Sequence, residues 1–329
     1  MTVYLSLLVA GALLSLLLTP LVTSASTALG LVDAPGGRKV HSTAVPRIGG
    51  LAIVAAASAA LLLVVLALPA VGIPAPDFRH LAPVAVGAAL VFVVGLIDDF
   101  TALPAWVKLA VQTIAATIVM ASGLLIERLT VGGATWQLGI LSYPVTLAWV
   151  IGLTNAFNLI DGIDGLAAGI AVIAGATCAA ILVGRGHAAE AMLVTALVGA
   201  ALGFLVFNTS PASIFLGDGG SLVFGFVLAT TAITGWQKGA TALAAGVPLL
   251  IFALPLADAA STLVRRLGRR PAAGRVTPAA LVRQIAEPDR EHIHHRLMAL
   301  GWSPRQIVVI LYLLTVLLAA AALATARFD

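Results

Sequence analysis

Long apolar segments alternate with short polar ones along almost the whole chain. Because a helix rises about 1.5 Å per residue, a helix that crosses a bilayer needs roughly 20 mostly apolar residues. The ninth such segment contains Pro248 and Pro255, and proline bends or breaks a helix. The predicted spans are residues 3–29, 49–71, 81–97, 104–123, 141–157, 166–184, 188–207, 219–235, 241–263 and 305–326. The pattern predicts an all-α polytopic membrane protein of about ten spans with a broken ninth helix.

Basic residues lie mostly on one side of this predicted bundle. One face holds the loops at residues 30–48, 98–103, 158–165, 208–218 and 264–304. This face and its helix ends carry thirteen of the 18 Lys and Arg residues. Cytoplasmic loops are enriched in Lys and Arg. We therefore expect this face to be cytoplasmic and both termini to be external.

The composition agrees with a membrane location. The 329 residues are 60% hydrophobic and 10% charged, with a mean hydropathy of +1.09, which is more apolar surface than a soluble chain of this size can bury. The net charge of +4 does not indicate a nucleic-acid partner. Cys178, the single cysteine, lies in an apolar run and offers no disulfide. We expect residues 1–329 to form one integral-membrane domain.

Three further segments have a readable local pattern. The first apolar run has no basic segment before it and no obvious cleavage site, so it is predicted to stay as a transmembrane helix. Residues 124–140 alternate apolar and polar positions around a Gly-Gly pair, which predicts a small external β-hairpin. Residues 277–282 predict a short amphipathic helix at the surface.

Carboxylates lie at the predicted cytoplasmic ends of the helices. In a membrane protein an acidic residue is costly and indicates a functional site. Asp98 and Asp99 are adjacent at a helix end, and neighbouring carboxylates repel unless a cation lies close to them. Asp218 has glycines on both sides. Helix capping does not require those glycines, so a metal or phosphate site is favoured.

A second acidic motif lies between the fifth and sixth predicted helices. Asp161 and Asp164 are three residues apart, and a glycine follows each of them. Glycines let a ligand approach the backbone closely, and a helix N-terminus attracts phosphate or carbonyl oxygen. Helix capping would account for one of these two aspartates, but it does not readily account for both.

The last predicted cytoplasmic loop combines imidazole and guanidinium groups. Residues 289–296 read Asp-Arg-Glu-His-Ile-His-His-Arg. Zinc ligation is one interpretation, but the loop has no sulfur ligand, and the flanking arginines favour an anion such as phosphate. Asp258, in the ninth helix, is explained equally well as a structural partner of a basic residue or as part of the site.

Together these groups are suited to phosphoryl transfer. Carboxylate oxygens suit Mg²⁺, and a cation beside basic groups neutralises the charge of a diphosphate. The sequence has no Gly-x4-Gly-Lys-Ser/Thr loop, which excludes a P-loop ATPase. A transporter with an acidic cytoplasmic vestibule is the alternative class. Its ionisable residues would lie near the bilayer midplane rather than at the helix ends.

Four motifs resemble a known family, and the resemblance extends from about residue 33 to 305. They are Asp98-Asp99…Lys108, Asn155-x2-Asn158-x2-Asp161-Gly162-x-Asp164-Gly-Leu, Phe215-Leu-Gly-Asp218-x-Gly-Ser and His292-Ile-His294-His295-Arg296. The set resembles the polyprenyl-phosphate N-acetylhexosamine-1-phosphate transferases. The resemblance implies transfer of a sugar-1-phosphate from a UDP-N-acetylhexosamine to undecaprenyl or decaprenyl phosphate, with release of UMP. It also implies a bacterial inner-membrane location, with the active site on the cytoplasmic face, and inhibition by tunicamycin.

The same resemblance implies roles for individual residues. Asp218 would ligate Mg²⁺, or Mn²⁺ in its place, with help from Asn158. Asp98 and Asp99 would lie beside the lipid phosphate. The other implied positions are Lys108, His294, His295 and Arg296 at the diphosphate and sugar, Gly162 and Asp164 near the uracil, and Asn155, Asp161 and His292 elsewhere in the substrate site.

The histidine motif indicates the branch of the family. His-Ile-His-His-Arg-Leu, followed by Gly-Trp-Ser-Pro-Arg-Gln at residues 301–306, resembles the WecA/TagO-like branch, which uses UDP-GlcNAc. MraY, which transfers phospho-MurNAc-pentapeptide, typically has three consecutive histidines there and is the alternative. Some WecA-like members have an extra C-terminal helix, whereas ten spans are predicted here. The hexosamine epimer, the downstream glycan pathway, the lipid length and the choice between monomer and homodimer stay open.

Overall fold

The computed structural model describes residues 1–33, 44–131, 134–236, 246–268 and 292–326. Its helices are α1 (Thr2–Ala28), α2 (Gly49–Ala67), α3 (Ala82–Thr101), α4 (Ala105–Ala121), α5 (Ser142–Ile160), α6 (Leu166–Gly184), α7 (Ala188–Asn208), α8 (Gly217–Trp236), α9 (Gly246–Ile251), α10 (Ala253–Gly268), α12 (Ile293–Ala299) and α13 (Pro304–Ala326). Its strands are β1 (Val32–Asp33), β2 (Val45–Pro46), β3 (Arg128–Val131) and β4 (Ala134–Gln137). Short 3₁₀ segments, such as η2 (Arg79–Leu81), extend some helices.

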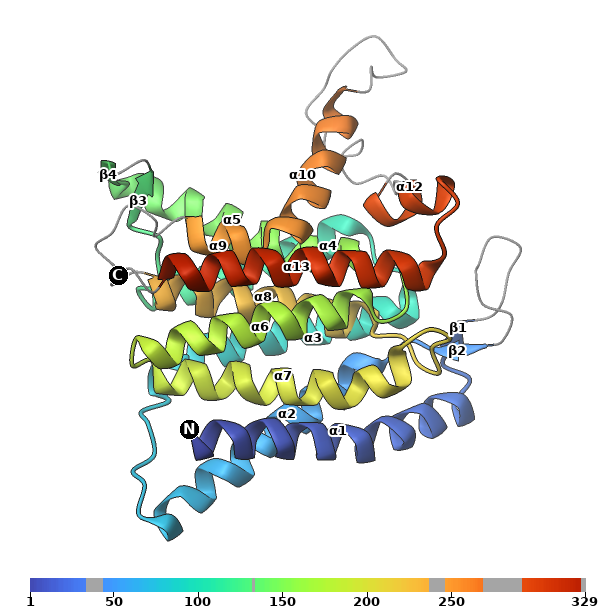
Figure 1. Ribbon diagram of the computed structural model, residues 1–329, viewed down its shortest axis with the longest axis horizontal. Helices are drawn as coiled ribbons and strands as arrows, with labels where there is room; N and C mark the ends of the chain where they lie inside the picture. Colours follow the sequence, from blue (N-terminus) through green and yellow to red (C-terminus); the bar gives the residue numbers. More distant parts are fainter. Residues whose placement is uncertain (34–43, 132–133, 237–245, 269–291, 327–329) are drawn as a thin grey trace.

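The long helices lie side by side in one bundle (Figure 1). Among the described residues, eight helices are long and apolar enough to cross a membrane, and α4 is a shorter apolar helix. The predicted ninth span appears as two helices, α9 and α10, and α10 leaves the bundle (Figure 1). The all-α polytopic architecture and the broken ninth helix are confirmed. Residues 241–245 and the predicted helix at 277–282 lie outside the described residues.

The two ends of the bundle differ in character. We call the end with Asp98, Asp161 and Asp218 the aspartate end, and the end with strands β3 and β4 the hairpin end. The predicted hairpin is confirmed, because β3 pairs with β4 in antiparallel register from Arg128↔Gln137 to Val131↔Ala134. Helix α1 begins and α13 ends at the hairpin end (Figure 1), as expected for an even number of spans.

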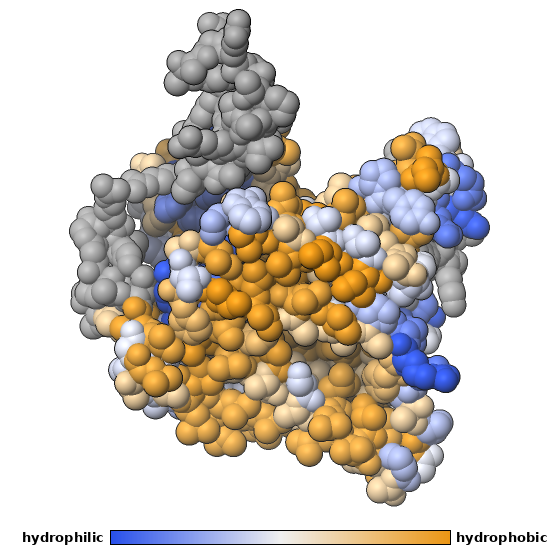
Figure 2. All heavy atoms as spheres, turned by 180° about the vertical axis from the view of Figure 1, so that it is seen from behind, coloured by the Kyte–Doolittle hydropathy of each residue, from blue (hydrophilic) through white to orange (hydrophobic). Residues whose placement is uncertain are grey.

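Helix α8 is the central element of the bundle. In the most apolar 18-residue stretch of α8, 83% of the residues are buried, whereas the corresponding shares are 22% in α1 and 28% in α13. The outer helices instead present their apolar side chains on the surface, which forms a broad hydrophobic area (Figure 2). Such a surface fits a lipid environment and not water. The residue that α8 carries in its first turn, Asp218, is therefore held by the most enclosed helix of the protein.

At the aspartate end, several predicted helix boundaries were wrong by a few residues. Helix α3 continues to Thr101, and α8 already begins at Gly217. Asp98, Asp99 and Asp218 therefore lie on helices, not in the loops to which the hydrophobicity pattern assigned them. That pattern marks where a helix stops being apolar, whereas backbone hydrogen bonding continues beyond this point.

Candidate active site

The start of α8 is fixed by backbone contacts with the segment before α2. Phe215 N–H donates to the Pro46 carbonyl over 2.8 Å, and Gly49 N–H donates to the Phe215 carbonyl over 2.9 Å. Glycine is required where the two backbones approach, because a Cβ on Gly50 would lie 2.2 Å from the Gly220 nitrogen. This docking brings the N-terminus of α8 to the aspartate end in one defined position.

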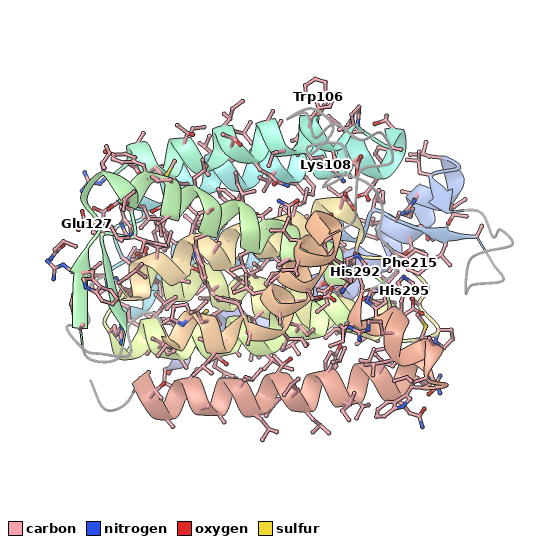
Figure 3. The ribbon with its side chains drawn as sticks, turned by 90° about the horizontal axis from the view of Figure 1, so that it is seen from above. Trp106, Lys108, Glu127, Phe215, His292 and His295 are labelled. Atoms are coloured by element: carbon pink, nitrogen blue, oxygen red, sulfur yellow. The ribbon has the colours of Figure 1, made fainter. Side chains whose placement is uncertain are left out.

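Lys108 links carboxylates from two other helices. Its Nζ donates to Asp98 Oδ2 over 2.7 Å and to Asp218 Oδ2 over 2.8 Å. The three side chains come from α4, α3 and α8, and they are 20%, 12% and 26% exposed. Figure 3 shows Lys108 at the same end of the bundle as His292 and His295. The structure thus brings three predicted site residues into direct contact and leaves them accessible from the surface.

Asp99 holds the first turn of α8. Its Oδ1 accepts from Asp218 N–H over 2.8 Å, and its Oδ2 accepts from Gly219 N–H over 3.1 Å. A carboxylate at this position satisfies N–H groups that have no partner within the helix and complements the helix dipole. Asp99 therefore orients Asp218 through its backbone. Its predicted contact with the lipid phosphate stays a prediction.

Asn158 and Asp218, the predicted metal ligands, lie beside each other. The Asn158 side-chain amide is within hydrogen-bonding reach of Asp218 and donates to Ser221 Oγ over 3.1 Å. Ser221 Oγ in turn donates to the Gly217 carbonyl over 3.0 Å. The amide is thus fixed against the first turn of α8, with its NH2 group directed at Ser221 and Asp218.

Negative charge accumulates around this turn. Asp161 directly follows α5. Burial raises its pKa well above the ordinary value, an effect that the charges of Asp218 and Asp99 increase and that of Arg47 opposes. Like charges confined together favour the binding of a cation. Asp164, four residues after the end of α5, accepts from Ala212 N–H over 3.1 Å and ties two loops of the aspartate end together.

The histidine motif is anchored by Asp258. Its Oδ2 is 2.9 Å from His292 Nδ1, and its Oδ1 accepts from Ile293 N–H over 2.7 Å. Asp258 therefore holds the start of α12, and the structural-partner interpretation is the one that its contacts support. The basic residue that it pairs with is His292.

His294, a residue of this motif, is buried against the loop that carries Asp161 and Asp164. A Cβ on Gly162 would lie 2.3 Å from His294 Nε2, so Gly162 is needed to make room for the imidazole. Burial, with the neighbouring His295 and His292, lowers the pKa of His294 to about 4. The ring centroids of His294 and His295 are 4.4 Å apart. His294 is therefore neutral near pH 7, while His295 and Arg296 are exposed.

Gln112 is a polar residue of the site region that the sequence motifs did not reveal. It is 1% exposed, and its Oε1 accepts from Asn155 Nδ2 over 2.6 Å. A lone glutamine one turn after Lys108, in an apolar helix, was the available signal. Tyr312 was also missed. Its hydroxyl donates to the Gly165 carbonyl over 2.5 Å, which fixes the loop that carries Asp161 and Asp164.

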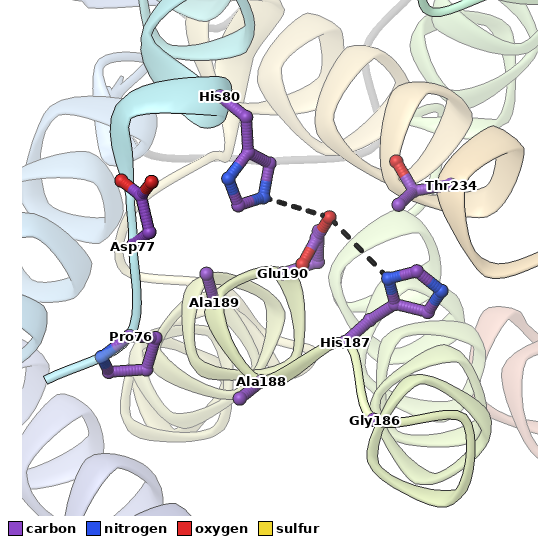
Figure 4. Close-up of a pocket in the computed structure, with 9 residues that line it drawn as sticks. All are labelled: Pro76, Asp77, His80, Gly186, His187, Ala188, Ala189, Glu190 and Thr234. Carbon is purple, nitrogen blue, oxygen red and sulfur yellow. Dashed lines mark hydrogen bonds and ion pairs between the residues drawn. The ribbon is translucent and has the colours of Figure 1, made fainter. Parts of the chain in front are cut away.

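A pocket of about 410 Å³ lies at the opposite, hairpin end (Figure 4). Its polar centre is Glu190, whose Oε1 is 3.1 Å from His80 Nε2 and 3.9 Å from His187 Nδ1. Among the described residues no group of three or more His, Cys, Asp or Glu side chains is arranged to hold a metal ion.

Known proteins resemble this chain over most of its length. The profile of glycosyl transferase family 4 matches residues 81–236. The probable undecaprenyl-phosphate N-acetylglucosaminyl 1-phosphate transferase of Bacillus subtilis is 37% identical over 302 residues, which cover 91% of this chain and 78% of that protein. The decaprenyl-phosphate N-acetylglucosaminephosphotransferase of Mycolicibacterium smegmatis is 35% identical, with 91% and 76% covered. The undecaprenyl-phosphate alpha-N-acetylglucosaminyl 1-phosphate transferase of Escherichia coli K12 is 28% identical, with 89% and 76% covered.

The match to the family profile includes three of the four sequence motifs and every element from α3 to α8. The matches to the relatives extend over nearly the whole chain, at identities that shared composition alone does not explain. The chain therefore belongs to glycosyl transferase family 4.

Proposed function

We propose that this protein transfers N-acetylglucosamine-1-phosphate from UDP-GlcNAc to a polyprenyl phosphate and releases UMP. The observation that carries the proposal is the bridge of Lys108 between Asp98 and Asp218, which joins two motifs of the family at one accessible point. The names of the relatives, undecaprenyl- and decaprenyl-phosphate N-acetylglucosamine phosphotransferases, support this donor and this class of acceptor over phospho-MurNAc-pentapeptide transfer.

Mg²⁺ is the proposed cofactor, and the residues present fit it. Mg²⁺ is commonly held by one or two protein oxygens together with substrate phosphates. Asp218 would supply the carboxylate oxygen, and the neighbouring Asn158 side chain would supply its amide oxygen once the amide turns from Asp218 to the ion. When bound there, the ion would neutralise charge on the donor diphosphate. Lys108 donates to the Asp218 carboxylate and would contribute a second positive charge near the donor diphosphate.

The chemical step is proposed to be a single displacement. An oxygen of the lipid phosphate forms a bond to the β-phosphorus of the donor, and the bond from that phosphorus to the bridging oxygen breaks, so that UMP leaves. A phosphate monoester has a second pKa of about 6, so the acceptor is largely a dianion at pH 7 and needs little general-base help. Asp98, beside Lys108, positions the acceptor and takes any residual proton.

The surrounding residues hold these groups in place. Asp99 fixes the backbone at Asp218, and Asp258 fixes α12, from which Arg296 and His295 reach the donor. Electrostatic preorganisation of this kind supplies much of the rate enhancement in phosphoryl transfer. The site is proposed to face the cytoplasm of a bacterial inner membrane, where soluble UDP-sugar meets the membrane lipid.

The test is a UMP-release assay with purified protein in detergent or liposomes. UDP-GlcNAc with undecaprenyl phosphate should give UMP and a lipid-linked sugar, and UDP-MurNAc-pentapeptide should be used far more slowly. Efficient use of the pentapeptide donor would move the protein to the MraY branch. A stoichiometric burst of UMP without lipid phosphate would replace the single displacement by a covalent phosphosugar intermediate.

A further inference from the structure

Gln112 lies at the point where α4 enters the packed part of the bundle. Residues 105–111, which precede it in the helix, are all exposed or half-exposed, whereas Gln112 is 1% exposed. Lys108 is four residues before Gln112, about one helical turn away, so both lie on the same face of α4. The position of Lys108 therefore depends on how firmly this first buried residue is held.

Gln112 is held by a reciprocal pair of amide hydrogen bonds to α5. Asn155 Nδ2 donates to Gln112 Oε1 over 2.6 Å, and Gln112 Nε2 donates to Asn155 Oδ1 over 3.3 Å. Asn155 Nδ2 also donates to the Ile151 carbonyl over 2.8 Å. Because an unpaired amide is costly in an apolar setting, these contacts strongly favour one relative position of the two helices.

The same pair lies one turn from a second site residue. Asn158 follows Asn155 by three residues, so the two share a face of α5. The pair thus joins α4 and α5 one turn from Lys108 on the first helix and one turn from Asn158 on the second. Both of these residues are within hydrogen-bonding reach of the Asp218 carboxylate.

We propose that Gln112 and Asn155 are positioning residues, whose reciprocal amide pair sets the spacing of Lys108 and Asn158 around Asp218. This inference rests on the proposed function, because it assigns the pair an effect on transfer from UDP-GlcNAc. It replaces the predicted substrate contact of Asn155 with an indirect role, since both polar atoms of that side chain bond within the protein.

The test compares five proteins: wild type, Gln112→Leu, Asn155→Leu, the double Leu variant and the exchange variant Gln112→Asn/Asn155→Gln. Each single Leu variant should lower kcat about tenfold and raise the Mg²⁺ concentration for half-maximal rate, with the donor KM changed less than twofold. The double Leu variant should be no slower than the worse single variant, because residues of one contact are not additive. The exchange variant preserves the combined side-chain length and should recover most of the lost kcat.

A matched control removes a buried hydrogen bond from the other end of α5. Thr146 is fully buried, and its Oγ1 accepts from Ile126 N–H over 2.8 Å. Thr146→Val should lower the thermal unfolding midpoint while kcat and the Mg²⁺ dependence stay within twofold of wild type. An equal loss of kcat in Thr146→Val and Gln112→Leu would overturn the inference, because the effect would then be general destabilisation.

Two other results separate the inference from the function on which it rests. Additive losses in the double Leu variant, with a raised donor KM in Asn155→Leu and no recovery in the exchange variant, would assign Asn155 to the substrate and overturn the positioning role alone. A wild-type protein that releases no UMP from any UDP-sugar with lipid phosphate would overturn the proposed function and the inference together.

Discussion

The two ends of the bundle both contain acidic residues beside basic groups, but in different balance. At the aspartate end Asp98, Asp161 and Asp218 gather around a bridge made by Lys108. At the hairpin end one buried carboxylate, Glu190, lies between His80 and His187. Among the residues that the structure describes, the first arrangement has more carboxylates than nearby cations, whereas the second surrounds a single carboxylate with two potential partners.

The hairpin end shows how a buried carboxylate can be satisfied within the protein. The pocket of about 410 Å³ lies beside Glu190, while the family motifs lie at the aspartate end. The Glu190 side chain is only 3% exposed, and its paired carboxylate joins the start of α7 to η2. At the rim, hydrogen bonds from Arg79 lower the pKa of Asp77 to about 2. The polar groups at this end are thus paired within the protein, whereas the carboxylates proposed to bind the metal at the aspartate end leave charge for a ligand to neutralise.

The strongest test of this contrast replaces one carboxylate by its amide at each end, and the larger effect is expected at the aspartate end. Asp218→Asn should lower kcat by roughly 10³-fold or more at saturating Mg²⁺, because the neutral amide weakens the proposed metal site and its contact with Lys108. The measurement is UMP release at several Mg²⁺ concentrations. Near wild-type turnover for this variant would remove Asp218 from the metal site and with it the functional distinction between the ends.

A second change probes the other partner of Lys108. Asp98→Asn should lower the rate about tenfold at pH 8, since Lys108 loses one anionic partner. The loss should be larger below about pH 6.5, where the lipid phosphate retains a proton that the amide cannot accept. The check is a pH–rate profile of variant and wild type with the same lipid. If the rate loss of Asp98→Asn does not vary with pH, Asp98 does not accept the proton of the lipid phosphate, and its role is only to hold Lys108.

A third prediction concerns stability at the aspartate end. The pKa of His294 is about 4 in the folded protein, against 6.5 for an ordinary histidine, so between these values the unfolded chain binds more protons. The free energy of unfolding therefore falls as the pH drops from 6.5 towards 4. Protonation of this histidine in the unfolded chain accounts for about 3 kcal/mol of that decrease. His294→Gln should flatten the dependence of the unfolding midpoint on pH in that range. An unchanged slope would show that the imidazole protonates without cost in the fold.

The smallest effect is expected from the hairpin end. Glu190→Gln keeps the shape of the side chain and one acceptor oxygen, so it should lower the free energy of unfolding by about 1 kcal/mol at pH 7. Turnover with UDP-GlcNAc should stay within twofold of wild type. The measurements are thermal unfolding in detergent and UMP release on the same preparation. A loss of kcat comparable with that of Asp218→Asn would show that the two ends are coupled.

The sequence by itself determined the membrane architecture and the residue types of the site. Apolar length and charge asymmetry are local properties of a chain that must satisfy its backbone within lipid, so the spans, the broken ninth helix and the acidic end could all be predicted. The motif spacing likewise selected Asp98, Lys108 and Asp218 before any contact between them was known.

Only the tertiary structure decided what those residues touch. Asp99 and Asp218 are 119 positions apart, and no local pattern shows that one carboxylate holds the backbone of the other. Gln112 and Asn155 carry no motif that links them, yet they form one amide pair. Such pairings depend on the close approach of helices at glycines such as Gly50 and Gly95, which is a property of the packed bundle. A sequence specifies the groups, and packing determines which of them are free to meet a ligand.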